Sequence, residues 1–142
     1  MARIFWDTNL FIYLFEDNPT FVEKVTQLRG HMLSRGDQLY TSALTVGEIV
    51  VKPIAARRND LETAYLSFFK RSGITVIPFD LSAAAAYARI RMDRGVRPPD
   101  AIQLACAAAA NIDLFITNDE RLSKNHVTGI NFITSLDRAP IV

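Results

Sequence analysis

Residues 3–9 read R-I-F-W-D-T-N, and this stretch decides the fold class. Its β-branched and aromatic run predicts a short buried strand over residues 3–6, which ends at Asp7. A second run of the same kind, L-F-I-T at residues 114–117, is followed by Asn118 and Asp119. Two acidic side chains therefore come just after predicted strands.

Around these two runs, strands and helices alternate along the chain. Shorter apolar runs predict further strands at residues 39–41, 74–77 and 131–133. Apolar residues at helical spacing predict helices at residues 9–15, 20–34, 43–51, 60–70, 82–94 and 100–110. This order predicts an α/β fold with a central, mostly parallel sheet of four to five strands. In such sheets ligands bind beyond the carboxyl ends of the strands.

Prolines, a serine and a glycine predict where several helices begin and end. We expect Pro19 just inside the start of the second helix, because proline is favoured in the first helical turn. Pro53 is expected to follow the end of the third helix. Ser82 is expected to cap the fifth helix and Gly95 to stop it.

The bulk composition favours one globular domain over residues 1–142. Because 49% of the residues are hydrophobic and 22% are charged, the chain can bury a core and lacks the signature of disorder. The one cysteine, Cys106, cannot form an internal disulfide and is interpreted as a small buried hydrophobe. No run approaches the roughly 20 apolar residues of a membrane span. With Asp7 so near the start there is no room for a signal peptide, so we expect a cytoplasmic protein.

The net charge of +1 does not by itself indicate a nucleic-acid binder. The charges are unevenly spread, however, and basic residues cluster in one segment. An RNA backbone would be attracted by such a cluster, although a solvated helix face explains it equally well. The cluster comprises Arg89, Arg91, Arg94 and Arg97.

Asp7 and Asp119 follow strands, where an acid is also a good helix N-cap, so capping alone is an alternative explanation. Glu48 would lie on the same helical face as the apolar Leu44 and Val51, where a carboxylate needs a partner such as a metal. The alternative for Glu48 is a surface ion pair with Lys52, four residues on.

Asp100 lies in the first turn of a predicted helix, directly after two prolines. The helix dipole alone favours an acid there by about 0.3–1 kcal/mol. The helix that follows is apolar nearly all round, which predicts that it is buried and that its start faces something specific.

Taken together, the four acids predict a carboxylate cluster. Mg²⁺ and Mn²⁺ prefer such oxygen ligands. These metals can activate water and stabilise the leaving oxygen of a phosphodiester. The chain has no P-loop, no G-x-G-x-x-G and no G-x-S-x-G motif, so the sequence signatures of nucleotide-binding folds and of a serine nucleophile elbow are absent.

Four motifs occur in an order that matches a known family and together span nearly the whole chain. They are F-W-D-T-N at residues 5–9, T-V-G-E-I at 45–49, P-P-D-A-I-Q-L-A at 98–105 and D-L-F-I-T-N-D-E-R-L at 113–122. With these motifs the chain resembles PIN-domain ribonucleases, and most closely VapC-type toxins of type II toxin–antitoxin systems. The resemblance implies a PIN-like three-layer α/β/α fold.

The resemblance also implies a site, a reaction and partners. It implies that Mg²⁺, with Mn²⁺ as an alternative, is held by Asp7, Glu48, Asp100 and Asp119, of which Asp7 and Asp100 would be the firmest ligands. Residues that flank the acids would support them through hydrogen bonds, namely Thr8, Asn9, Thr117 and Asn118. It implies hydrolysis of RNA to a 5′-phosphate and a 3′-hydroxyl, a homodimer, and silencing by a cognate antitoxin whose C-terminal segment covers the site.

Two other functions stay open at this point. One is a PIN-like module that binds RNA or protein without cutting, although the intact set of four acids argues against it. The other is a metal-dependent phosphoesterase or nuclease that acts on another substrate. Apolar residues near the start of the chain would form a groove for a partner's amphipathic helix or simply pack in the core; they are Phe11, Leu14, Phe15 and Phe21.

Overall fold

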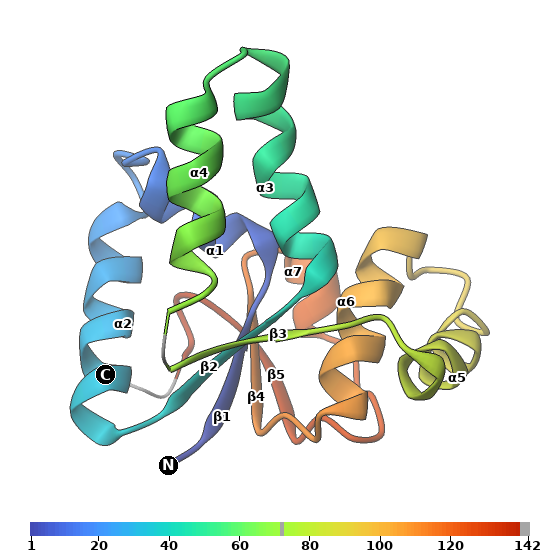
Figure 1. Cartoon of the computed structure of the whole chain (residues 1–142). Coiled ribbons are helices and arrows are strands. Elements are labelled where there is room, and N and C mark those ends of the chain that lie inside the picture. The colour runs from blue at the N-terminus through green and yellow to red at the C-terminus, as the bar shows by residue number, and fades with distance from the viewer. Residues whose placement is uncertain (72, 140–142) are drawn as a thin grey trace.

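The computed structural model describes residues 1–71 and 73–139 (Figure 1). Five strands form one sheet in the order β3-β2-β1-β4-β5, and every neighbouring pair is parallel. The predicted α/β fold is therefore confirmed, and the sheet is parallel throughout the described residues. The strands are β1 (Arg3–Trp6), β2 (Gln38–Ser42), β3 (Ile74–Ile77), β4 (Leu114–Thr117) and β5 (Phe132–Ser135).

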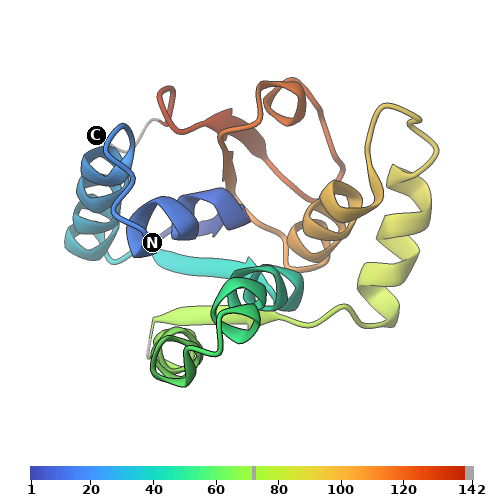
Figure 2. The same ribbon diagram turned by 90° about the horizontal axis from the view of Figure 1, so that it is seen from above.

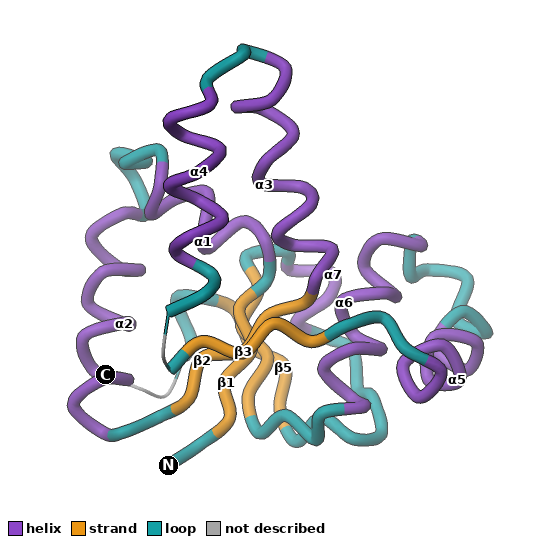
Figure 3. Tube along the Cα trace, in the orientation of Figure 1, coloured by secondary structure: helices purple, strands orange, loops and turns teal. Residues whose placement is uncertain are grey.

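Helices cover both faces of this sheet, which gives three α/β/α layers. Seen from above, α2 and α6 lie on opposite sides of the strands (Figure 2), and the tube view shows the strands gathered between them (Figure 3). The helices are α1 (Thr8–Phe15), α2 (Val22–Arg35), α3 (Ala43–Ala55), α4 (Asn59–Phe68), α5 (Leu81–Ile90), α6 (Pro98–Ala109) and α7 (Glu120–Ser123). Within the described residues, no helix has the length and apolar character needed to cross a membrane.

The central strand β1 is buried on both faces, which explains its continuous apolar sequence. Ile4 and Trp6 belong to the core under α1 and α2, whereas Phe5 belongs to the core under α5 and α6. All three side chains are fully buried. Phe5 stacks on Phe115 of β4 with ring centroids 4.7 Å apart, so aromatic packing joins the two strands that bear the acids.

The order of the strands defines a switch point between β1 and β4. From β1 the chain moves outward to β2 and β3, and it then crosses over to β4 and β5 on the other side. Trp6 pairs with Ile116 in the register, so the two strands end side by side. Ligands of parallel sheets bind at this point, and Asp7 lies there.

Two predictions about proline are wrong. Helix α3 continues through Pro53 to Ala55, because the proline costs one hydrogen bond near the helix end while its ring is buried in the protein. Helix α2 begins at Val22, after Pro19. The Asn18 side chain accepts hydrogen bonds from the backbone N–H groups of residues 20 and 21, which holds Pro19 in a turn before the helix.

The predicted limits of the fifth helix are also wrong. Asp80, not Ser82, caps α5 by accepting a hydrogen bond from the Ala83 N–H at 3.0 Å. The helix ends at Ile90 rather than near residue 94. Local bonds compete with the helix beyond that point, since Asp93 accepts from the Gly95 N–H in a tight turn.

Candidate functional site

A cavity of about 350 Å³ lies at the switch point, next to the ends of β1 and β4. All four acids that the sequence singles out line it, although they come from four different parts of the chain. The lining comprises Asp7, Thr8, Asn9, Ile12, Glu48, Pro99, Asp100, Gln103 and Asp119. The structure therefore brings the acids together, while their binding of a metal stays a prediction.

Asp7 is the most buried of the four acids, with only 8% of its surface exposed. It caps α1: its Oδ1 accepts from the Thr8 N–H at 2.8 Å, and its Oδ2 accepts from the Thr117 hydroxyl at 2.8 Å. Burial raises the pKa of Asp7 to about 6, although these two hydrogen bonds lower it. The charges of Asp100 and Glu48 add to the rise. Asp7 is thus both a cap and a carboxylate whose charged form is disfavoured by burial and by its acidic neighbours.

Glu48 lies on α3, and a residue of α1 holds its side chain through a hydrogen bond. The Thr8 hydroxyl donates to Glu48 Oε1 at 2.7 Å. Glu48 itself is exposed, and so is Val51, so the expected buried apolar face around Glu48 is wrong. The alternative ion pair is not formed either, because Lys52 bonds to Glu16 at 3.0 Å. Glu48 therefore lines the cavity, bonded to Thr8 and not to Lys52.

Asp100 lies in the first turn of α6, which Pro98 and Pro99 open as predicted. It is half-buried, and burial raises its pKa together with the negative charge of Asp119. The cations Arg121 and Arg97 oppose this rise. The helix behind Asp100 is buried, as predicted, so its N-terminus is fixed at the cavity.

Asp119 is held differently from the other acids. Its side chain caps α7 by accepting from the Arg121 N–H at 2.9 Å. The Arg121 guanidinium also binds Asp119 Oδ2 at 3.1 Å, and this contact lowers the pKa of Asp119. Asp119 is therefore already paired with a cation of the chain.

The four supporting residues differ in what they do. Thr8 and Thr117 bond directly to acids, as described above, and Thr117 also accepts from the Asp119 N–H at 3.0 Å. Asn118 donates to the Tyr13 hydroxyl at 3.1 Å, which ties the end of β4 to α1 rather than to an acid. Asn9 is exposed and lines the cavity.

Gln103 is a site residue that the sequence reasoning missed. It lies on α6 almost one turn after Asp100 and is 2% exposed at the base of the cavity. Its side-chain amide donates to the hydroxyls of Thr8 and Thr45 at 2.9 and 2.7 Å. The available signal was a lone amide in the otherwise apolar stretch A-I-Q-L-A, since a buried amide requires partners.

The chemistry of the cavity fits a divalent cation that keeps much of its water. Each Asp7 oxygen accepts one hydrogen bond and retains a lone pair. Mg²⁺ is usually bound through one or two carboxylates and several waters. Among the described residues, no three acidic, histidine or cysteine side chains are grouped closely enough to hold a metal alone. One of the four acids, Asp119, is also bound by Arg121.

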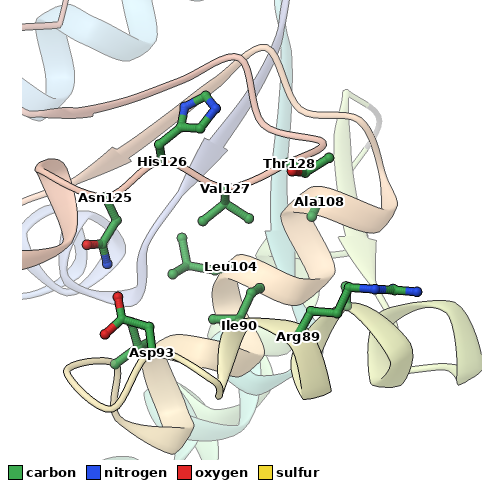
Figure 4. A pocket seen from close by; sticks show the side chains of 11 residues that line it. Arg89, Ile90, Asp93, Leu104, Ala108, Asn125, His126, Val127 and Thr128 are labelled. Carbon is green, nitrogen blue, oxygen red and sulfur yellow. The ribbon is translucent and has the colours of Figure 1, made fainter.

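A larger hollow of about 610 Å³ shares no residue with the acidic cavity. It lies between α5, α6 and the segment after α7, with Leu104 and Val127 inside and Asn125 and Asp93 toward one end (Figure 4). Asp93 is its one acid, so we place the candidate site at the smaller cavity. The four arginines at 89, 91, 94 and 97 are exposed, and their contact with RNA stays a prediction.

The model of the PIN domain family matches residues 4–126 of the chain. This match covers most of the sequence, and the cavity lies within it. The chain belongs to the PIN domain family. PIN domains generally use divalent metal ions, in keeping with the acids gathered here. No curated protein matches the chain.

Solved structures agree with this assignment at the level of the fold. VapBC2 from Rickettsia felis, bound to a promoter DNA fragment, matches with a TM-score of 0.72 and 15% identity, over 93% of this chain and 97% of that one. DNA-bound VapBC from Salmonella typhimurium matches with a TM-score of 0.68 and 22% identity, over 96% and 99%. A toxin–antitoxin complex from Klebsiella pneumoniae matches with a TM-score of 0.63 and 21% identity, over 89% and 94%. The likeness to VapC-type folds is thus confirmed.

Proposed function

We propose that the chain is a metal-dependent endoribonuclease and the toxin of a toxin–antitoxin pair. The observation that carries this proposal is the convergence of Asp7, Glu48, Asp100 and Asp119 on one cavity. Membership of the PIN domain family and the structural likeness to toxin–antitoxin complexes support it. We assign the whole of residues 1–142 to one domain and the protein to the cytoplasm.

Asp7 and Asp100 would hold the cation, which we propose to be Mg²⁺ with Mn²⁺ as a substitute. When bound, the cation would supply a Lewis acid and a water nucleophile at neutral pH. Asp7 is fixed for this role by Thr8 and Thr117, and Glu48 is oriented by Thr8. Asp100 is fixed by the buried helix α6. Glu48 and Asp119 would be weaker ligands of the same cation and would act partly through its bound water.

A groove beside the cavity favours an antitoxin segment as partner. A hollow of about 380 Å³ between α1, α3 and α4 shares Ile12 and Glu48 with the acidic cavity. Phe15 and Tyr65 line it and stack on each other at 4.7 Å. Phe11 is fully buried and belongs to the core instead. An amphipathic segment bound in this hollow would reach the acids.

We also propose that the toxin itself is a homodimer.

Cleavage of a mixed RNA pool tests the proposal. Wild-type protein should cut in Mg²⁺ and not in EDTA, and Asp100→Asn should not cut. The matched control is Asp60→Asn, because Asp60 lies in the first turn of α4, is exposed and is outside the cavity. If wild type and Asp100→Asn behave alike, the ribonuclease proposal fails.

Two substrates separate the proposal from its alternatives. Hydrolysis of a generic phosphate ester without cutting of RNA would favour a phosphoesterase. RNA binding without cutting in any divalent cation would favour a non-cleaving module. Expression that arrests growth, with relief by a co-expressed neighbouring small protein, is the expected result for a toxin.

A further inference from the structure

Gln103 lies at the centre of a hydrogen-bond network that connects α6 with α1 and α3. Its Nε2 donates to Thr8 Oγ1 at 2.9 Å and to Thr45 Oγ1 at 2.7 Å. Its Oε1 accepts from the Ser42 hydroxyl. Thr8 and Thr45 also share a hydrogen bond of 3.0 Å, and Thr8 contacts Glu48 Oε1 at 2.7 Å. Ser42, Thr45 and Thr8 are all buried, so water does not replace these partners freely.

The proton of each hydroxyl can be assigned from this network. A threonine hydroxyl donates once and accepts up to twice. Glu48 has no proton to offer when ionised, so Thr8 must donate to it. Because the Thr8 proton is then used, Thr45 must donate to Thr8. Thr8 thus accepts from both Gln103 and Thr45 and has only the proton toward Glu48 left to give.

The opposite orientation of the Gln103 amide would break this arrangement. Its oxygen would then face Thr8 and Thr45, and both hydroxyls would donate to it. Glu48 would lose the Thr8 proton, and the bond between the two threonines would be lost as well. The Ser42 hydroxyl would face a donor instead of an acceptor. Leaving buried polar groups unpaired destabilises the folded protein, which favours the orientation in which Nε2 faces the two threonines.

We propose that Gln103 is a positioning residue that directs the Thr8 proton to Glu48 and so fixes that carboxylate at the cavity. The inference deepens the proposed function and rests on it, because it concerns the same acidic site. The two acceptors of the Gln103 amide are the hydroxyls of Thr8 and Thr45, and of these two it is Thr8 that bonds to Glu48. Mutation of a residue that hydrogen-bonds directly to a metal ligand, as Thr8 would here, typically costs about 10- to 100-fold in metal affinity.

A double-mutant cycle with Thr8 tests this route. Binding of Mn²⁺ to the metal-free protein is measured by electron paramagnetic resonance, and folding is checked by thermal unfolding. Gln103→Leu and Thr8→Val should each weaken binding by about tenfold. In the Thr8→Val background, Gln103→Leu should then change binding by less than about twofold. Independent effects that multiply would overturn the inference.

Gln103→Glu provides a second test, which also applies if Gln103→Leu does not fold. In this variant the effect expected from the network is opposite to the effect of the added charge. Its carboxylate would accept from both threonines and take the Thr8 proton away from Glu48. The added negative charge alone would strengthen binding of a cation, so weaker Mn²⁺ binding is the expected and specific result. Stronger binding would contradict the inference. Gln38→Glu is the matched control, because Gln38 is exposed at the start of β2.

A spectroscopic readout separates this inference from the proposed function. The ¹³C signal of the Glu48 carboxylate in metal-free protein can be assigned by its loss in Glu48→Gln. Gln103→Leu should move the signal toward its position in Thr8→Val. If it moves although wild type neither binds Mn²⁺ nor cuts RNA, the proposed function fails and the inference stands. If it does not move, the inference fails whatever the activity.

Discussion

The Thr117 hydroxyl donates to Asp7 Oδ2 at 2.8 Å, across 110 positions of the chain. This bond joins the ends of β4 and β1, the two strands at the switch point. The Thr117 hydroxyl also accepts a hydrogen bond from the backbone N–H of Asp119, so one side chain contacts two of the four acidic residues. The position of Asp7 is therefore fixed by the fold and not only by its own helix.

Replacing Asp7 by Asn should abolish RNA cleavage without loss of folding. Asparagine still caps α1 well, and it removes a buried charge. The pKa of Asp7 is raised from 3.8 to about 6, so ionisation opposes folding by up to about 3 kcal/mol at neutral pH. Metal-free Asp7→Asn should thus be more stable than wild type at pH 7.5 by chemical denaturation. A lower stability would show that Asp7 is mainly a structural cap.

The stability of the metal-free wild type should depend on pH in a defined direction. Because the folded-state pKa of Asp7 is raised, protonation of Asp7 favours the folded state. This contribution to the free energy of unfolding is fully present below about pH 3.8 and is lost as the pH rises through about 6. Protons compete with a cation for the same carboxylate, so Mn²⁺ affinity should fall as pH drops below about 6. Calorimetric titration at pH 5, 6 and 7.5 measures this, and an affinity independent of pH would exclude Asp7 as a ligand.

Arg121→Gln should strengthen metal binding. Arg121 binds Asp119 Oδ2 at 3.1 Å, and its loss frees a carboxylate at the cavity. The pair is exposed on the arginine side, so we expect a change of roughly two- to fivefold in Mn²⁺ affinity. Lys124→Gln removes the same charge at the end of α7 and is the control. Weaker binding in Arg121→Gln would mean that the arginine supports the site instead of competing for it.

Gly129→Ala should destabilise the protein. Gly129 has φ +100°, and a Cβ there would lie 2.7 Å from the carbonyl oxygen of Ala108 at the end of α6. The combined strain should cost about 1–3 kcal/mol in the free energy of unfolding. Gly30→Ala on α2 is the control: its Cβ would meet no atom within 4 Å, and alanine favours helices. Equal stability of the two variants would contradict this account.

The strands and two of the acids were predictable because their signals are local. Asp7 and Asp119 directly follow the ends of apolar runs, and parallel strands place such ends at one edge. The lone amide of Gln103 in an apolar stretch indicates that it needs partners, but the sequence does not identify them, since they lie 95 and 58 positions away. The exposure of Glu48 was also missed, because it depends on how α3 packs. The passage of α3 through Pro53 likewise depends on the burial of this proline in the folded protein, which local helix propensity does not include.

The arrangement of β1 between β2 and β4 has a consequence during synthesis of the chain. Asp7 leaves the ribosome early, but its partner Thr117 and the last acid, Asp119, are made more than 100 residues later. Contacts of such long range form late in folding, because closing a long loop is slow. A growing chain that has not reached β4 therefore has no assembled cavity. For the ribonuclease proposed above, this order means that the acidic site is completed only when synthesis of the chain is nearly finished.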